Sequence, residues 1–207
     1  MAKRIFVWVA HPRETSLCAS LGDAYGEGAE AAGASLRRID LHAMDFDAGA
    51  GAGYGHAVPP LEPALIAWQE AVAWADHLLV VHPYWWGAMP ARAKAVLDRA
   101  LLPGFGFKYH ARGLMWDRLL TGRTADTIIT SDTPPWYDTL AYRRPGRRVL
   151  RNQVLEFCGI QVRRQVQFGP VKTASPDRIA GWLAKARRMG GEAAARKGAR
   201  RGTGLRS

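Results

Sequence analysis

The chain has 207 residues, two cysteines, a hydrophobic fraction of 48% and a formal net charge of +11. This length and composition predict one globular domain with a complete core and exclude a mostly disordered chain. No apolar run reaches the roughly 18 residues that a membrane span requires, so we expect no membrane span and a cytoplasmic location. Cys18 and Cys158 lie far apart without CxxC spacing, which argues against a disulfide framework and against a metal site.

Much of the positive charge lies in two segments, residues 143–151 and the residues from 185 onward. A basic surface attracts anions such as nucleotide phosphates, but net charge governs encounter and solubility rather than chemistry. We expect one domain over residues 1–190 and a flexible basic tail over residues 191–207. The tail has no interleaved aromatic residues and no known nucleic-acid-binding motif, so specific binding of nucleic acid is not expected.

Short apolar runs alternate with amphipathic stretches along the whole chain. The expected strands cover residues 4–9, 35–41, 77–82, 126–130 and 161–168. The expected helices cover residues 16–32, 62–75, 91–102, 144–158 and 176–195, and a glycine-rich loop is expected over residues 48–60. This alternation predicts an α/β fold with a doubly wound, five-stranded parallel sheet in the order 2-1-3-4-5 and helices on both faces.

In a sheet of this kind, ligands bind beyond the carboxyl ends of the strands where the strand order reverses. The loops to consider therefore follow the first, third and fourth strands. They are residues 10–18, 82–90 and 130–138.

The first loop leads directly into a helix N-terminus, where free N–H groups and the helix dipole favour a phosphate. Thr15 and Ser16 add hydroxyl groups, and His11 adds a further hydrogen-bonding group. The alternative is that Thr15 or Ser16 only caps the helix. The sequence lacks the glycine-rich pattern of a Walker loop here.

The second loop contains Pro83, Tyr84, Trp85, Trp86 and Gly87. Three aromatic residues at the end of a buried strand favour a wall for a flat ring system, and glycine permits a close approach of ligand to backbone. The alternative is that the aromatic side chains turn inward as core.

The third loop begins with Thr130, Ser131, Asp132 and Thr133, which offer hydroxyl groups and backbone donors. Two prolines and the pair Trp136–Tyr137 follow. A simple turn would explain the residues from Asp132 to Pro135, but it explains the aromatic pair less well.

The residues just described carry a resemblance to a known family. Residues 82–109 (HPYWWGAMPARAKAVLDRALLPGFGFKY) resemble the signature of the flavodoxin-like NAD(P)H:quinone oxidoreductases, the DT-diaphorase and modulator-of-drug-activity B group. Residues 11–17 (HPRETSL) resemble the first loop of this family, and residues 39–46 (IDLHAMDF) resemble the segment that closes its second strand. The similarity runs from about residue 4 to residue 185.

This resemblance implies a flavodoxin-like fold and a homodimeric enzyme with bound FAD or FMN, FAD being slightly favoured. NAD(P)H would reduce the flavin and leave, and a quinone-type acceptor would then take two electrons in a ping-pong mechanism. The resemblance implies that His11, Thr15, Ser16 and Leu17 lie at the flavin phosphates. It also implies that the isoalloxazine ring lies between residues 83–87 and residues 130–133.

Two departures from the family pattern concern the third loop. DT-diaphorase-like members have a glycine pair there, followed by a tyrosine and a histidine proposed to assist proton chemistry. This chain has Pro134–Pro135 in that loop and no histidine after His110. Tyr137 matches the tyrosine, and we expect it to be the catalytic hydrogen-bonding residue; the alternative is that it only forms a wall of the pocket.

Two other functions remain open at this point. An azo- or nitro-compound reductase would share every motif and differ in its acceptor. An ancillary regulatory subunit of a potassium-efflux system would share the same loops, but its role would be regulation instead of quinone reduction.

Overall fold

The computed structural model describes residues 2–49 and 60–196. Its main sheet has five parallel strands in the order β2-β1-β3-β6-β7. The strands are β1 (Arg4–Val9), β2 (Ser35–Asp40), β3 (His77–Pro83), β6 (Thr124–Thr130) and β7 (Gln161–Phe168). This confirms the predicted order 2-1-3-4-5, because only the two short strands of a separate hairpin come between β3 and β6 in the sequence.

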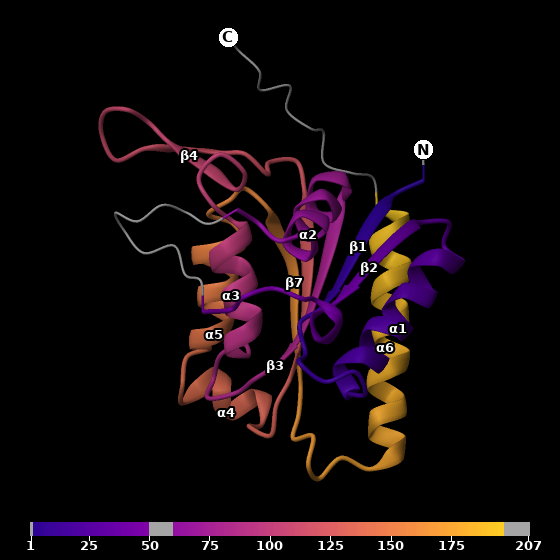
Figure 1. Ribbon diagram of the computed structural model, residues 1–207. Coiled ribbons are helices and arrows are strands. Elements are labelled where there is room, and N and C mark those ends of the chain that lie inside the picture. The colour runs from indigo at the N-terminus through magenta and orange to yellow at the C-terminus, as the bar shows by residue number, and fades with distance from the viewer. Residues whose placement is uncertain (1, 50–59, 197–207) are drawn as a thin grey trace.

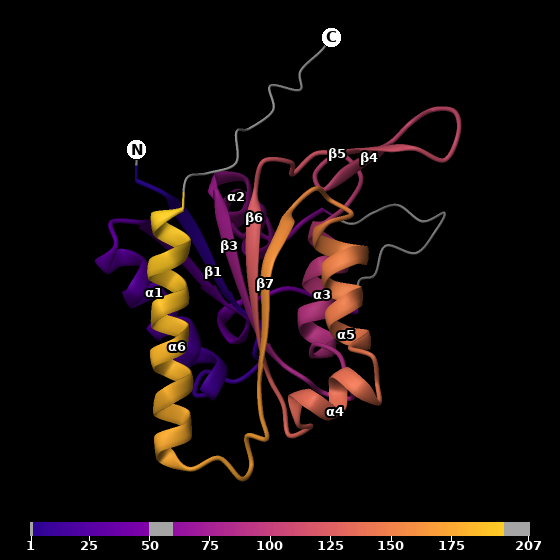
Figure 2. The same ribbon diagram turned by 180° about the vertical axis from the view of Figure 1, so that it is seen from behind.

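Helices cover both faces of the sheet (Figure 1). Helices α1 (Leu17–Ala31) and α6 (Pro176–Ala195) lie side by side on one face, as Figure 2 also shows. Helices α2 (Pro63–Trp74), α3 (Ala91–Ala100) and α5 (Pro145–Arg148) lie on the other face, together with the π-helical segment η2 (Val149–Leu155). A short turn of 3₁₀ helix, η1 (Leu41–Ala43), follows β2.

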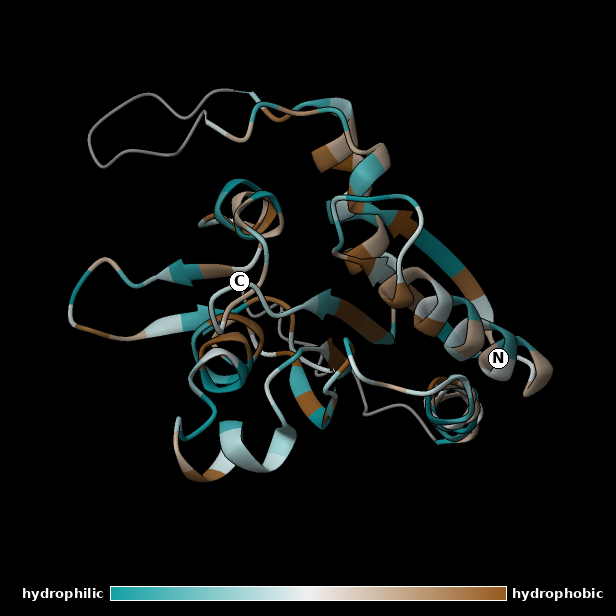
Figure 3. Cartoon of the chain, turned by 90° about the horizontal axis from the view of Figure 1, so that it is seen from below, coloured by the Kyte–Doolittle hydropathy of each residue, from teal (hydrophilic) through white to brown (hydrophobic). Residues whose placement is uncertain are grey.

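Two hydrophobic cores result, one on each face of the sheet. Every residue of β3 and β6 is buried, because these central strands are covered on both sides. On the α1 and α6 side the core includes Val7, Tyr25 and Met189, and on the other side it includes Trp8, Trp68 and Val96. Figure 3 views these layers from below, with hydrophobic strand segments at the centre and helices that alternate between hydrophobic and hydrophilic residues.

Three local predictions were incomplete. The hairpin of β4 (Phe107–Tyr109) and β5 (Trp116–Arg118) was not predicted. A helix, α4 (Pro135–Leu140), occupies part of the segment predicted as the third loop. The single helix predicted over residues 144–158 consists of the short α5 followed by η2, and it starts at Arg144 in a left-handed conformation (φ 57°).

Some predictions fall outside the described residues. Residues 50–59 of the predicted glycine-rich loop and residues 197–207 of the predicted tail are among these. Helix α6 ends at Ala195, within the segment that was predicted as tail. Among the helices of the described residues, none is long and apolar enough to cross a membrane.

Candidate functional site

The three loops singled out by sequence meet at the carboxyl edge of the sheet. Backbone hydrogen bonds extend the strand pairing into them. Ala10 N donates to Val81 O (2.7 Å), Tyr84 N donates to Thr130 O (2.7 Å), and Ser131 N donates to Phe168 O (3.0 Å). The loops are therefore held next to one another at the point where the strand order reverses.

The first loop forms a cradle at the N-terminus of α1. A cavity of about 220 Å³ is lined there by His11, Arg13, Thr15, Ser16, Leu17, Cys18, Thr130 and Val171. Ser16 caps the helix, because its Oγ accepts a hydrogen bond from Ala19 N (3.1 Å). The N–H groups that precede Ala19 in the first turn have no partner within the helix and are available to an anion. Ser16 can therefore cap the helix and also contribute to an anion site, because its hydroxyl hydrogen is still available to donate to a ligand.

His11 links the first loop to the second. Arg13 N donates to His11 Nδ1 (3.0 Å), and the His11 ring meets the Trp85 ring edge-on with centroids 6.0 Å apart. Burial lowers the pKa of His11, although the backbone of Arg13 opposes this shift. A neutral His11 that accepts at Nδ1 carries its proton on Nε2, where it can donate to a ligand.

The second loop is a tight turn from Trp85 to Ala88. Trp85 N donates to Ala88 O (2.8 Å) and Ala88 N donates to Trp85 O (3.2 Å). At its tip, Trp86 and Gly87 both have positive φ values, 53° and 72°. A tryptophan in this conformation is strained, and the Trp86 side chain is fully exposed. The turn therefore presents an indole ring to the outside of the molecule, as a wall for a flat ligand requires.

Side chains of the third loop make hydrogen bonds within the loop, with β7 and with the loop that follows β7. Ser131 Oγ donates to Thr133 O (2.7 Å) and accepts from Gln167 Nε2 (2.7 Å). Asp132 Oδ1 accepts from Lys172 N (2.7 Å). These bonds leave the Ser131 hydroxyl without a hydrogen for a ligand. The Ser131 backbone is engaged as well, because its N–H donates to Phe168 O (3.0 Å) and its carbonyl accepts from Val171 N (3.0 Å). The loop after β7, residues 169–172, supports the third loop and was not singled out from the sequence.

A wide pocket of about 740 Å³ separates the second and third loops. Its lining residues are Tyr84, Trp86, Gly87, Ser131, Asp132, Thr133, Asp138, Ala141, Tyr142 and Pro145. The expected residues Tyr84, Trp86 and Gly87 thus face Ser131, Asp132 and Thr133 across one space. Asp138, Ala141, Tyr142 and Pro145 were not anticipated, because α4 was not predicted. A proline at the first helical position, here Pro135, was the signal for this helix.

Tyr137 lies beside this pocket and is not among the residues that line it. Its side chain is 41% exposed and meets the rings of Trp136 and Tyr142 edge-on, at centroid distances of 5.5 and 5.0 Å. Tyr142 lines the pocket in its place. Tyr137 therefore contacts a residue of the pocket wall, Tyr142, without lining the pocket itself.

An apolar groove of about 360 Å³ adjoins the same turn. It is lined by His82, Trp86, Gly87, Ala88, Met89, Lys94, Leu97, Pro145, Gly146, Val149, Leu150 and Val154. His82 is buried, its Nδ1 donates to Pro83 O (3.0 Å), and its Nε2 has no hydrogen-bond partner among the described residues. Burial lowers the pKa of His82 to about 4. His82 is therefore a neutral histidine at the edge of this groove at physiological pH.

No group of three or more potential metal ligands occurs among residues 2–49 and 60–196. Cys18 and Cys158 are both buried free thiols. Burial raises the pKa of Cys18 to about 12, which keeps this thiol protonated beside the cradle.

A family model described as "Flavodoxin-like fold" matches residues 3–189, and the chain belongs to this family. Rat NAD(P)H dehydrogenase [quinone] 1 (Rattus norvegicus) is 23% identical over 184 residues, which cover 77% of this chain and 66% of that protein. The solved structure of NAD(P)H:quinone oxidoreductase from Methanothermobacter marburgensis has a TM-score of 0.78 and 22% identity, covering 93% of this chain and all of that one. An FMN-dependent NADH-azoreductase from Bacillus anthracis, solved with FMN, has a TM-score of 0.70 and 15% identity, with coverages of 93% and 100%. The two solved structures share the fold of this chain, and the resemblance stated from its sequence motifs is confirmed.

Proposed function

We propose that the protein is a flavin-dependent NAD(P)H oxidoreductase that reduces a quinone-type acceptor. The observation that carries this proposal is the pairing of two cavities at one edge of the sheet. An anion cradle of about 220 Å³ lies at the N-terminus of α1, and an aromatic-walled pocket of about 740 Å³ lies beyond the second loop. A flavin nucleotide has the matching parts, a phosphate group and a flat ring. The names of the quinone-reducing relatives support the same activity.

The residues of the three loops have distinct parts in this proposal. The first turn of α1, with Thr15 and Ser16, would hold the flavin phosphate, and His11 would add a donor at Nε2. The exposed Trp86 would lie along the ring, and Gly87 would allow close approach of the backbone. The backbone N–H groups of Asp132 and Thr133 would reach the polar edge of the ring. A bound flavin supplies the hydride and electron chemistry itself.

Proton handling at the acceptor would fall to tyrosine in this chain. We propose that the Tyr137 hydroxyl donates a hydrogen bond to the acceptor. Tyr142 would position the Tyr137 ring and the acceptor. The family's histidine has no counterpart in the third loop. Phenol groups can donate a hydrogen bond and hold a proton near a developing oxyanion.

A homodimer is part of the proposal. Large apolar side chains are exposed around the wide pocket, where a second copy would cover them. They are Trp86, Trp136, Leu140, Tyr142 and Val149. The cofactor is proposed to be FAD or FMN, and the azoreductase solved with FMN gives FMN more weight than the sequence motifs did. That neighbour also supports an azo compound as a second candidate acceptor.

The experiment is a visible absorption spectrum of the purified protein after incubation with FMN or FAD and desalting. We expect the blue absorption band of the flavin to survive desalting and to bleach when NADH or NADPH is added without oxygen. Reoxidation by a quinone, compared with an azo dye, then identifies the acceptor class. A protein that retains neither flavin would overturn the proposal and leave a regulatory role for the fold.

A matched pair of variants tests the cradle. Thr15→Val removes one hydroxyl at the exposed first loop, and Thr173→Val makes the same change at an exposed position outside both cavities. We expect Thr15→Val to weaken flavin binding by at least about tenfold, because one hydrogen bond from a hydroxyl group to the charged phosphate is lost. Thr173→Val should bind like the unaltered protein. Equal affinity in all three proteins would contradict the assignment of the cradle.

A further inference from the structure

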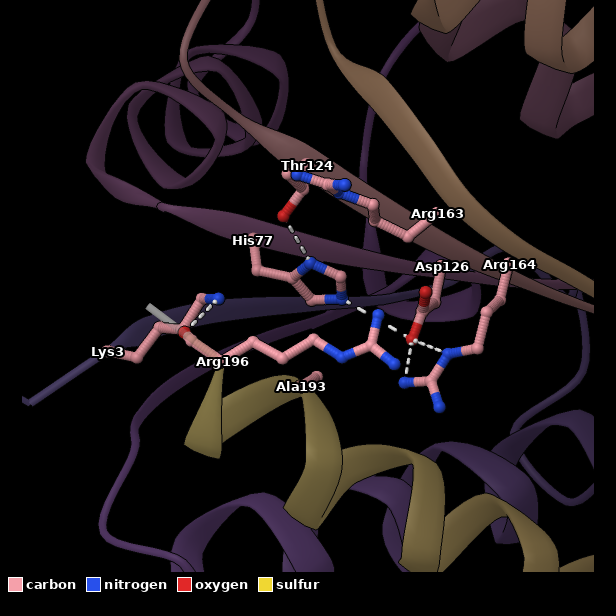
Figure 4. Close-up of a pocket in the computed structure, with 8 residues that line it drawn as sticks. All are labelled: Lys3, His77, Thr124, Asp126, Arg163, Arg164, Ala193 and Arg196. Carbon is pink, nitrogen blue, oxygen red and sulfur yellow. Dashed lines mark hydrogen bonds and ion pairs between the residues drawn. The ribbon is translucent and has the colours of Figure 1, made fainter. Parts of the chain in front are cut away.

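A second polar cavity lies at the opposite edge of the sheet from the three loops. It has a volume of about 290 Å³ and is lined by Lys3, His77, Thr124, Asp126, Arg163, Arg164, Ala193 and Arg196. Figure 4 shows these residues. His77 and Thr124 are the first residues of β3 and β6, and Ala193 and Arg196 lie at the C-terminal end of α6. The cavity is therefore built from the amino ends of the central strands, far along β3 and β6 from the flavin loops.

A β-bulge gives this cavity two consecutive arginines. Ala125 pairs with Val162 and Asp126 pairs with Arg164, so Arg163 is an extra residue in β7. Neighbouring residues of a regular strand point to opposite faces, and an extra residue changes that alternation. Here Arg163 and Arg164 both line the cavity. Bulges of this kind commonly redirect a side chain at a binding site.

Asp126 is fully buried at the inner end of the cavity and is already neutralised. Its Oδ2 accepts hydrogen bonds from Arg164 Nη2 (2.5 Å), Arg164 Nε (3.0 Å) and the Tyr25 hydroxyl (3.1 Å). The Tyr25 hydroxyl is 2.9 Å from His77 Nε2, and His77 Nδ1 is 2.7 Å from Thr124 Oγ1. Arg164 Nη1 also donates to Glu192 Oε2 (2.7 Å). This network holds Arg164 in place, while Asp126 Oδ1 is buried and has no hydrogen-bond partner among the described residues.

Three further cations line the cavity, and none of them makes an ion pair with another residue of the described chain. Among residues 2–49 and 60–196, the guanidinium groups of Arg163 and Arg196 make no hydrogen bond and no ion pair, and Lys3 Nζ donates only to Arg196 O (2.9 Å). In Figure 4 the Arg196 side chain extends across the cavity toward Asp126 and Arg164. Burial lowers the pKa of Lys3, and the charges of Arg163 and Arg196 act in the same direction against the opposing effect of Asp76 and Asp126. The cavity therefore holds like charges together that an anion would stabilise.

We propose that this cavity is a binding site for a small phosphate-bearing anion, separate from the flavin site. Arg163, Arg196 and Lys3 would donate hydrogen bonds to the phosphate oxygens. Asp126 would hold the Arg164 guanidinium in place beside them. Arginine matches phosphate geometry with paired N–H groups, which favours a phosphate over a monovalent ion. A volume of about 290 Å³ accommodates inorganic phosphate or a small phosphomonoester and lies at the lower end of the range for ligand pockets. The site does not depend on the redox function proposed above.

The test is calorimetric titration of the full chain with inorganic phosphate, at constant ionic strength set by chloride. The titration is performed with the protein saturated with flavin, so that the cradle at α1 is occupied, and again without flavin. We expect saturable binding with a dissociation constant below about 1 mM. The double variant Arg163→Gln/Arg196→Gln should bind phosphate at least tenfold more weakly, roughly, because two charge-assisted hydrogen bonds are lost. Neither side chain makes a hydrogen bond or ion pair with another described residue, so this variant should fold normally.

The matched control is Arg112→Gln/Arg188→Gln, which removes the same charge at two exposed arginines outside the cavity. This control should bind phosphate like the unaltered chain. Phosphate should also raise the Tm of the unaltered chain and of the control, and not that of Arg163→Gln/Arg196→Gln. The proposal is overturned if phosphate binding is absent, if it survives in the cavity variant, or if both double variants lose it equally. A chain that binds phosphate but no flavin would contradict the redox proposal alone.

Discussion

Arg147 Nη2 donates a hydrogen bond of 2.8 Å to Asp138 Oδ2, and both side chains are buried. Asp138 belongs to α4 and Arg147 to α5, so the ion pair joins the two short helices that wall the wide pocket. Gln165 Nε2 donates to Arg147 O (3.1 Å), which ties the same pair to β7. The position of Tyr142 and Pro145 at the pocket therefore depends on one buried charge pair.

Asp138→Asn should lower the free energy of unfolding by about 3 kcal/mol. The change leaves the buried Arg147 guanidinium without its counter-charge, and breaking a buried pair on one side is strongly destabilising. Urea denaturation measures the loss, and flavin titration should show weaker binding because the pocket wall moves. The double variant Asp138→Leu/Arg147→Met should recover part of the stability, since it removes both charges. A loss below about 1 kcal/mol in Asp138→Asn would mean that the pair is effectively solvated.

Two glycines of α6 should respond to alanine in opposite directions. A Cβ at Gly190 would lie 1.9 Å from Tyr25 O, because α1 and α6 cross closely there, whereas a Cβ at Gly181 would have no atom within 4 Å. Gly190→Ala should therefore lose at least about 2 kcal/mol of unfolding free energy through overpacking. Gly181→Ala should gain about 0.5–1 kcal/mol, since alanine loses less conformational entropy in a helix. Chemical denaturation of both variants measures the change in unfolding free energy, and a loss in Gly181→Ala would contradict the open space around this position.

The central sheet was predictable because its signals are local. The apolar runs of β3 and β6 are typical of strands buried on both faces, and their alternation with helices leaves few possible strand orders. The β4–β5 hairpin was missed because each strand has only three residues, too few for a periodic pattern. The bulge at Arg163 depends on the pairing of β7 with β6, which no single segment encodes.

The candidate site was predictable in its loops and less so in its walls. The rule that ligands bind beyond the carboxyl strand ends identified residues 10–18 and 82–90. Pro134 and Pro135 were interpreted as a stiff turn, but they begin α4, which places Tyr142 at the pocket and Tyr137 beside it. The engagement of Ser131 with Gln167 depends on a contact between distant segments, so the sequence offered no signal for it.

Trp86→Asn should separate function from stability. Trp86 has a φ of 53° and a fully exposed side chain, so its replacement loses no packing within the chain. Asparagine tolerates this conformation, and we expect the free energy of unfolding to rise by up to about 1 kcal/mol. Flavin affinity should fall by up to about tenfold through the loss of ring stacking. Trp86→Phe is the control and should keep most of the affinity; a loss of stability in Trp86→Asn would show that the indole packs in solution.

Tyr137→Phe and Tyr142→Phe distinguish proton handling from pocket shape. Both changes remove one hydroxyl and keep the ring pair, whose centroids lie 5.0 Å apart. If Tyr137 acts at the acceptor, its variant should reduce quinone more slowly by about 10- to 100-fold, while flavin reduction by NAD(P)H stays unchanged. Stopped-flow measurement of the two half-reactions separates these steps. A slower acceptor step in Tyr142→Phe alone would transfer the role to Tyr142.

His82 should make the stability of the fold depend on pH between about 6.5 and 4. Its pKa is lowered to about 4 by burial, and its ordinary value is 6.5. Above the ordinary value, His82 is neutral in the folded and unfolded states alike and its contribution is fully present. As the pH falls below it, the unfolded chain binds a proton that the folded chain does not, so stability is lost, reaching about 3 kcal/mol near the folded pKa. His77 is also buried, with a pKa lowered by burial, and contributes with the same sign.

The measurement is therefore the difference between the unaltered chain and His82→Gln in urea denaturation across this range, with the exposed His42→Gln as control. His82→Gln should lose less stability on acidification than either, and parallel pH curves for all three would show that His82 titrates as it does in water.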